Sequence, residues 1–201
     1  MKKITLVALL IVSSVASAQK MKVVSGNYNF LKGEKELNVE FNYDDLKLMK
    51  ENLTNDQYVA ERVADLNEKS RGNGDNWKKK WDSSRELIWN SKFLELLNST
   101  YGKAKDVRIM ENNPDAKYTL IVDAVWIYPG WDIAMMKKPA KVTLRYRFVE
   151  TANRGNVLLE MTSSEAPGDQ YGSNFSNESR IGEGFAKSAK SLGKEISKKL
   201  K

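Results

Sequence analysis

Residues 178–200 carry an apolar stripe that limits the possible folds of this chain more than any other feature. Large apolar side chains recur there at helical spacing along one face, and lysines occupy the opposite face. Each such side chain contributes roughly 1.5–3 kcal/mol when it is buried, so this helix needs another layer of structure to cover its stripe. The stripe consists of Ile181, Phe185, Leu192, Ile196 and Leu200, and the lysines are Lys187, Lys190, Lys194, Lys198 and Lys201.

A block of strand-like periodicity precedes this helix. Residues 118–128 form a nearly continuous apolar run, residues 142–150 alternate between apolar and polar, and residues 157–163 form a third apolar segment. These patterns predict three strands. Strands followed by an amphipathic helix predict a sheet against which the helix docks.

The N-terminal half predicts two further strands and two helices. Residues 22–31 and 36–43 have the pattern of strands. Thr54 and Gln57 form a capping-box signature, which marks the start of a helix that ends near the Gly-Asn-Gly break at 72–74. A second helical stretch covers residues 76–101.

The predicted element order is β-β-α-α-β-β-β-β-α, with a short strand at 107–110. We therefore expect one α+β domain over residues 19–201, with a mainly antiparallel mixed sheet, helices packed on one side and a C-terminal amphipathic helix. All five tryptophans lie between residues 77 and 131. Their clustering predicts that the middle helix and the first long strand share one core.

Residues 1–18 have the three parts of a secretory signal peptide: the basic start Lys2-Lys3, a short apolar run, and an Ala-Ser-Ala end. The run is shorter than the about 20 residues that a membrane span needs. Cleavage before Gln19 removes two lysines and lowers the formal net charge from +7 to +5. We expect a periplasmic or secreted protein with no integral membrane segment after cleavage.

The chain contains no His and no Cys. Thiol nucleophiles, disulfides, imidazole bases and thiolate or imidazole metal sites are therefore excluded. No glycine-rich nucleotide loop is present either. We expect no enzyme, no cofactor, no metal and no catalytic residue.

The connection from residue 126 to residue 139 is too apolar for an ordinary surface loop. Its Pro129-Gly130 pair suits the centre of a type II turn. Two interpretations remain open: the connection folds back as local core, or it exposes an adaptable aromatic and methionine surface to a partner. In the second case the candidate partner-binding residues are Tyr128, Trp131, Ile133, Met135 and Met136.

Charged residues share one predicted face of the three central strands. Strand alternation places Asp123 on one face of the sheet and Leu120 and Trp126 on the other. The residues that share one face are Asp123, Arg145, Arg147 and Glu160. One interpretation is a cross-strand charge ladder. The other is a carboxylate pair in a glycosidase-like cleft, although adjacent arginines would lower the carboxylate pKa values and weaken a general acid.

Lysines and aromatics alternate at residues 77–81. A positive segment interleaved with tryptophans resembles single-strand nucleic-acid binders, but core tryptophans beside a solvated lysine face explain it as well. We expect no nucleic acid as partner. If the patch Lys78, Lys79 and Lys80 binds anything, anionic envelope polymers are the candidate ligand.

Elements between residues 105 and 200 also carry a family resemblance. They are the strand that begins Tyr118-Thr-Leu-Ile-Val-Asp123, the Pro129-Gly130 loop, the strands 140–148 and 157–161 around a turn at 153–156, and a final helix with Phe185-Ala186. In this order they resemble the small α/β module of exported bacterial envelope proteins, as in the curli-secretion pore lipoprotein, the outer-membrane activator of penicillin-binding proteins and the N-terminal domain of the Tol propeller protein. The preceding part, with Lys80-Trp81 and Arg85-Glu86, resembles exported proteins of Gram-negative bacteria.

The resemblance implies a protein that binds other envelope proteins or assembles, without catalytic residues. Several members are lipoproteins, whereas this chain has no Cys to acylate. We therefore expect a non-enzymatic binding protein of the cell envelope, with another envelope protein as partner. The alternatives are a carbohydrate-binding or carbohydrate-active protein that uses Asp123 and Glu160, and a binder of anionic polymers.

Overall fold

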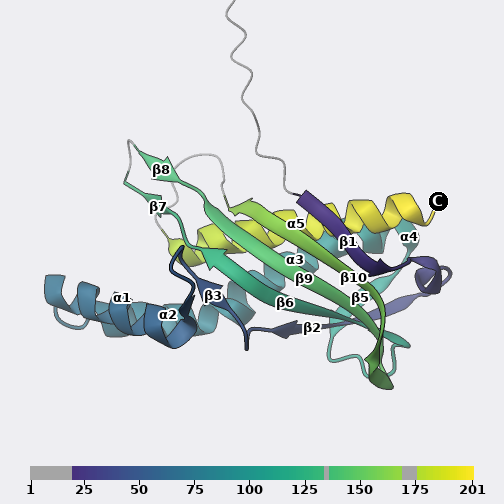
Figure 1. The fold of residues 1–201 in the computed structure, drawn as a ribbon, viewed down its shortest axis with the longest axis horizontal. Helices are drawn as coiled ribbons and strands as arrows, with labels where there is room; N and C mark the ends of the chain where they lie inside the picture. Colours follow the sequence, from purple (N-terminus) through teal and green to yellow (C-terminus); the bar gives the residue numbers. More distant parts are fainter. Residues whose placement is uncertain (1–19, 134–135, 169–175) are drawn as a thin grey trace, which may run out of the picture.

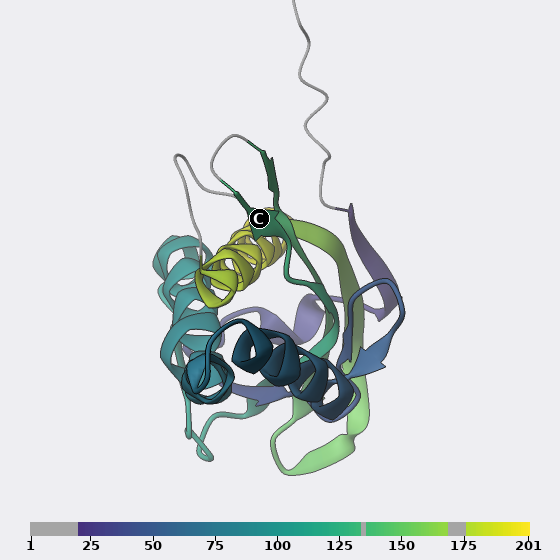
Figure 2. The ribbon, with the colours of Figure 1, turned by 90° about the vertical axis from the view of Figure 1, so that its left-hand side faces the viewer.

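A strongly twisted sheet forms one layer of the molecule, and the helices lie on one side of it (Figures 1 and 2). The computed structural model describes residues 20–133, 136–168 and 176–201. The expected signal peptide, residues 1–18, lies outside the described residues. The strands of the main sheet are β1 (Lys20–Gly26), β2 (Glu36–Asn42), β3 (Lys47–Leu48), β4 (Leu53–Thr54), β5 (Arg108–Glu111), β6 (Tyr118–Tyr128), β9 (Ala140–Glu150) and β10 (Asn153–Gly168).

The sheet is mixed, in the order β1-β10-β9-β6-β2-β5, with β3 and β4 attached beside β6. Neighbours from β1 to β6 are antiparallel, whereas β2 runs parallel to both β6 and β5. A separate two-stranded ribbon joins β7 (Trp131–Asp132) to β8 (Lys137–Lys138). The predicted α+β class with a C-terminal amphipathic helix is confirmed.

The helical layer contains one long path that was predicted too short. Residues 73–105 follow this path, whereas the prediction covered residues 76–101. The elements are α1 (Asn55–Lys69), α2 (Asn73–Ser84), α3 (Ser91–Leu97), α4 (Lys103–Lys105) and α5 (Asn177–Lys199), with the 3-10 turn η1 (Asn29–Leu31) and the π-helical segments η2 (Arg85–Asn90) and η3 (Asn98–Gly102). Among the helices of the described residues, none is both long and apolar enough to cross a membrane.

The apolar stripe of α5 is buried against the sheet and against α3. Ile181, Phe185, Leu192 and Ile196 are all 0% exposed. The Phe185 ring stacks on Trp89 with centroids 5.8 Å apart. At Gly184 an added Cβ would lie 2.5 Å from a methyl group of Val142. A larger residue would therefore push α5 away from β9.

The predicted capping box at the start of α1 is confirmed. The Thr54 hydroxyl accepts from the Gln57 amide, and the Gln57 side chain accepts from the Thr54 amide. Two backbone amides that lack helical partners are satisfied in this way. The middle tryptophans also lie in the core as expected, since Trp81 and Trp89 are fully buried.

The predicted strand over residues 22–31 is wrong in its second half. β1 ends at Gly26, which has a φ of +83°, and Asn29–Leu31 forms a 3-10 turn. The Asn27 side chain accepts a hydrogen bond from the Asn29 amide at 2.9 Å. Such local side-chain-to-backbone bonds compete with strand pairing, and the apolar pattern of this segment did not reveal them.

We predict that Phe185→Ala lowers the free energy of unfolding by about 3–5 kcal/mol, because it removes a fully buried aromatic ring from the contact between α5 and the core. Urea denaturation followed by circular dichroism measures this. Lys190→Ala, at an exposed position of the same helix, is the control and should change stability little. Equal effects of the two changes would contradict the docking of α5 described above.

Candidate functional site

An irregularity in β6 determines which side chains reach the open face of the sheet. The register between β6 and β9 shifts between Ala124 and Trp126, which is a β-bulge. Up to Ala124, alternate side chains point to the core, and after the bulge the buried position is Ile127. The expectation that Trp126 shares the face of Leu120 is therefore wrong, because the extra residue reverses the alternation.

The bulge places Trp126 and Tyr128 together at one end of this open face. Their rings are nearly parallel, with an angle of 16° and centroids 6.4 Å apart. The Trp126 indole N–H donates to the backbone oxygen of Met49 at 2.7 Å. The ammonium group of Lys138 lies over the Tyr128 ring, 5.0 Å from its centroid. The aromatic pair is thus held in place by neighbours from β3–β4 and from the ribbon.

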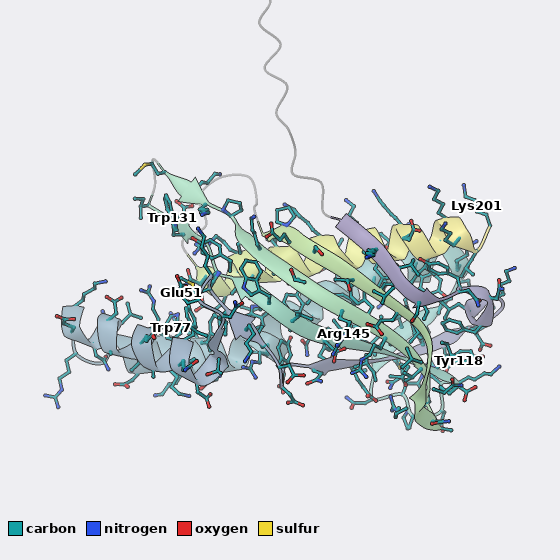
Figure 3. The ribbon with its side chains drawn as sticks, in the orientation of Figure 1. Glu51, Trp77, Tyr118, Trp131, Arg145 and Lys201 are labelled. Atoms are coloured by element: carbon teal, nitrogen blue, oxygen red, sulfur yellow. The ribbon has the colours of Figure 1, made fainter. Side chains whose placement is uncertain are left out.

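The β7–β8 ribbon extends beyond the end of the sheet (Figure 1), and Trp131 lies on it (Figure 3). Its turn is closed by a hydrogen bond from the Ile133 amide to the Met136 oxygen at 3.0 Å. Trp131 is 39% exposed, Ile133 60% and Met136 59%. Met135, the other residue predicted for this surface, lies outside the described residues. The described part of the connection therefore presents its apolar side chains to solvent instead of folding back as core.

A buried arginine fastens the base of this ribbon to helix α5. Arg180 is 4% exposed. Its guanidinium donates to the backbone oxygens of Pro129 and Gly130, at 3.2 Å each, and to the side chain of Asn177. Burial lowers the pKa of Arg180 from its ordinary value, which shows that the charge is costly to place here. We infer that these carbonyl contacts compensate that cost and fix the Pro-Gly turn.

Gly130 completes the base of the ribbon. Its φ is +67°, a value that favours glycine in a turn. An added Cβ would also lie 2.3 Å from the Lys138 oxygen. The ribbon that carries the exposed apolar side chains therefore begins at a constrained turn.

The predicted charged face is present, and it forms a hydrogen-bonded network. Asp123 receives bonds from Arg147, at 2.8 and 2.9 Å, and from Arg145 at 3.1 Å. Glu160 lies opposite Arg147 in the register of β10 and β9. Burial alone would raise the pKa of Asp123, but hydrogen bonds and charge from the two arginines hold it below its usual range. An aspartate kept ionised in this way is a poor general acid.

The lysine segment of α2 lies away from the sheet. Lys78, Lys79 and Lys80 are exposed, and Lys78 forms an ion pair with Asp82 at 2.5 Å. Trp81 is fully buried, and Trp77 packs against the core. The aromatic side chains are therefore not presented beside the lysines, as base stacking would require.

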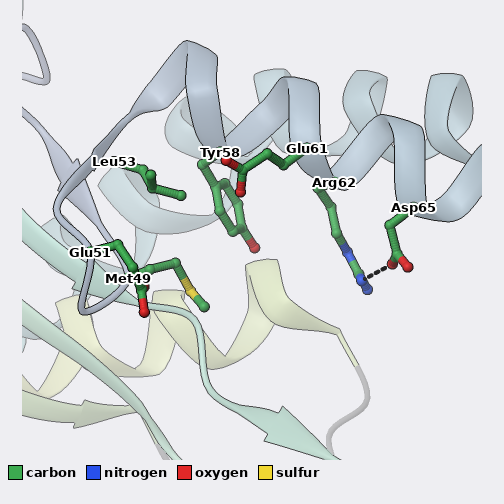
Figure 4. Close-up of a pocket in the computed structure, with 7 residues that line it drawn as sticks. All are labelled: Met49, Glu51, Leu53, Tyr58, Glu61, Arg62 and Asp65. Atoms are coloured by element: carbon green, nitrogen blue, oxygen red, sulfur yellow. Dashed lines mark hydrogen bonds and ion pairs between the residues drawn. The ribbon is translucent and has the colours of Figure 1, made fainter.

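A hollow of about 400 Å³ between α1 and the β3–β4 turn was not predicted from the sequence. In Figure 4 the Tyr58 hydroxyl points into it, beside Met49 and the ion pair between Arg62 and Asp65, which measures 2.8 Å. Burial raises the pKa of Tyr58 to about 12. This phenol stays protonated at neutral pH, so it offers a hydrogen bond and not a base.

Within the described ranges of the chain, no group of three or more acidic side chains is arranged to hold a metal ion. The structure separates the predicted partner-binding residues into two groups. Tyr128 belongs with Trp126 on the sheet, and Trp131, Ile133 and Met136 belong to the ribbon. The apolar composition of the connection predicted Tyr128 as a candidate but not Trp126, because the bulge has no recognisable sequence pattern.

Comparisons with known proteins do not assign a family. No family model matches the chain, and no curated protein matches it. Among solved structures, similarity is found to the PelC dodecamer from Paraburkholderia phytofirmans, with a TM-score of 0.39 and 11% identity over 87% of this chain and 97% of that one. A variant of the same dodecamer gives a TM-score of 0.37 and 12% identity over 85% and 98%.

We predict that Arg180→Met loosens the ribbon, because it leaves two turn carbonyls without their donor. Amide hydrogen exchange of residues 131–138 should accelerate, and the free energy of unfolding should fall by about 1–3 kcal/mol. Exchange measured by mass spectrometry tests this. Lys190→Met, on the exposed side of α5, should leave exchange in the ribbon unchanged; unchanged exchange in Arg180→Met as well would refute the anchoring role.

We predict that Asp123→Asn costs about 1.5–3 kcal/mol of stability at neutral pH, because charge-assisted hydrogen bonds are lost. The folded pKa lies below the unfolded value, which is about 3.9. The carboxylate therefore stabilises the fold fully above the unfolded pKa and loses this effect as the pH falls through the folded pKa. Denaturation from about pH 6 to about pH 2 should show the two proteins converging in stability. A constant difference across that range would exclude this coupling.

Proposed function

We propose that the protein is an exported, non-enzymatic binding protein of the bacterial cell envelope. The support for export is the leader-like sequence of residues 1–18. The support for binding is the ribbon, whose apolar side chains are exposed although its base is fixed by Arg180. We propose another envelope protein as the partner, as the resemblance of residues 105–200 also implies.

The observation that carries this proposal is the combination of exposure and constraint at the ribbon. Large apolar side chains on a surface cost little singly, but several together mark contact sites. A constrained turn loses little conformational entropy on binding, which improves affinity. Trp131 and Met136 flank Ile133 on the ribbon, and aromatic and methionine side chains are enriched at the centres of protein interfaces.

The absence of enzymatic activity is also part of the proposal. The chain has neither His nor Cys, and Asp123, the carboxylate proposed for a carbohydrate-active alternative, is held by two arginines. A cross-strand network accounts for Asp123 without catalysis. We propose that the protein binds its partner and does not convert it chemically.

We predict that replacing both Trp131 and Met136 by Ala reduces partner capture at least tenfold while the protein stays folded, because exposed side chains contribute little to stability. The test is affinity capture with cross-linking from the native envelope, read by mass spectrometry, with wild type and variant compared for each captured protein. Unfolding by urea checks that the variant is intact.

Leu87→Ala provides the matched control. Leu87 is 72% exposed and lies on η2, outside the ribbon. Its replacement removes an exposed large apolar side chain away from the ribbon and should leave capture unchanged. The proposal fails if the ribbon variant captures the same proteins in the same amounts as wild type, or if Leu87→Ala loses them equally.

A further inference from the structure

A second site lies at the base of the ribbon, on the open face of the sheet. A hollow of about 300 Å³ is lined there by Lys50, Trp126, Tyr128, Lys138, Lys141 and Glu165. This volume is at the lower end of the range for small-molecule sites, about 300–1,000 Å³. Its lining comes from the β3–β4 turn, β6, β8, β9 and β10.

Two bulges on either side of β9 shape this hollow. One lies in β6 between Ala124 and Trp126, and the other lies in β10 between Ser163 and Ala166. Both are opposite the same part of β9, since Trp126 pairs with Thr143 and Ala166 pairs with Val142. Bulges re-aim side chains and are frequent beside functional sites.

The backbone at the rim of the hollow is strained as well. Glu165, in the β10 bulge, has a φ of +50°, and Met49, which fixes the Trp126 indole, has a φ of +64°. Residues other than glycine adopt such values at a cost of about 1–3 kcal/mol, and these positions cluster at ligand sites. The backbone N–H of the strained Glu165 donates a hydrogen bond to the Thr143 hydroxyl at 3.1 Å, and its side chain forms an ion pair with Lys141 at 2.5 Å.

The side chains of the hollow combine two recognition chemistries. Trp126 and Tyr128 provide two nearly parallel aromatic rings in fixed positions. Three lysines against the single Glu165 give the lining a net charge of +2. Aromatic faces pack against the C–H groups of pyranose rings, ammonium groups pair with carboxylates, and a carboxylate accepts hydrogen bonds from hydroxyls.

We propose that this hollow binds a carboxylated oligosaccharide, such as a chain of uronic acids. In this arrangement Trp126 and Tyr128 carry sugar rings, and Lys50 and Lys138 bind carboxylates. Glu165, which stays paired with Lys141, accepts hydrogen bonds from hydroxyl groups. The carboxylate of Glu165 favours a hydroxyl-rich ligand, because sugar hydroxyl groups can donate hydrogen bonds to it and the phosphodiesters of nucleic acid have no hydrogen to donate. The proposal is independent of protein binding by the ribbon, because it uses none of the residues Trp131, Ile133 and Met136.

The test uses defined oligosaccharides with the full mature chain. Titration calorimetry and tryptophan fluorescence measure binding of tetragalacturonate and tetramannuronate, beside neutral cellotetraose and the nucleotide dT4. We expect at least one uronate to bind about tenfold or more tightly than cellotetraose and dT4, a difference of ~1.4 kcal/mol. Its affinity should fall as salt rises, because exposed charges are screened beyond about 10 Å at 0.1 M salt.

Variants locate the site. Tyr128→Ala should weaken uronate binding about tenfold and Lys138→Gln about fivefold, since stacking and one ion pair are lost. Lys190→Gln removes the same charge from an exposed position of α5 and should change affinity less than twofold. Circular dichroism checks that each variant is folded. If Tyr128→Ala does not fold, the loss of affinity in Lys138→Gln alone tests the site.

Several outcomes would overturn the proposal. One is no binding of either uronate at millimolar concentration. Another is equal weakening by Lys190→Gln and Lys138→Gln, which would show general charge attraction. A third is dT4 binding as tightly as the uronates, which would assign the hollow to nucleic acid. Uronate binding and partner capture are tested with different variants. The Trp131 and Met136 variant can lose partner capture and still bind uronates, so failure of one proposal does not imply failure of the other.

Discussion

The contact between helix α5 and the sheet is the interaction on which the rest of the structure depends. Phe185 stacks on Trp89, and Trp89 contacts Trp81, so the C-terminal helix and the helical path of residues 73–105 share one aromatic core. A buried hydrogen-bond chain crosses the same interface: Tyr146 of β9 contacts Ser188 of α5, which bonds Ser163 of β10 at 2.6 Å. Polar groups that are satisfied in this way specify one docking position. The first turn of the same helix then carries Arg180 and thereby positions the ribbon.

Much of this architecture follows from hydrophobic period alone. The stripe from Ile181 to Ile196 predicted both the helix and its buried side, because 3.6-residue spacing leaves one orientation that covers all the large side chains. The bounds of β6 also follow from its continuous apolar run. Strand pairing does not follow in the same way. β2 lies parallel between β5 and β6, and the spacing of hydrophobic residues does not indicate which strands pair or in which direction.

The candidate sites were less predictable, for a physical reason. A bulge is one residue in an otherwise regular strand, and nothing in the sequence around Val125 separates it from continued alternation. Trp126 was therefore assigned to the wrong face. For the ribbon, the apolar side chains after a Pro-Gly turn left two interpretations open, local core and exposed surface, because their spacing does not tell whether another element covers them. The anchor of the ribbon could not be anticipated, because Arg180 is about 50 residues away in sequence and resembles any other polar residue of an amphipathic helix.

The bulge also has a consequence for how strand β6 can change. Before it, Leu120 and Val122 contribute to the interior, and any altered volume there affects the whole fold. Beyond the bulge, Ile127 points inward, and Trp126 and Tyr128 point outward. One continuous strand is thus divided into a half whose residues are constrained by packing and a half whose residues are constrained by what they contact outside. Substitutions in the second half can therefore change the outer surface of the sheet without repacking the interior.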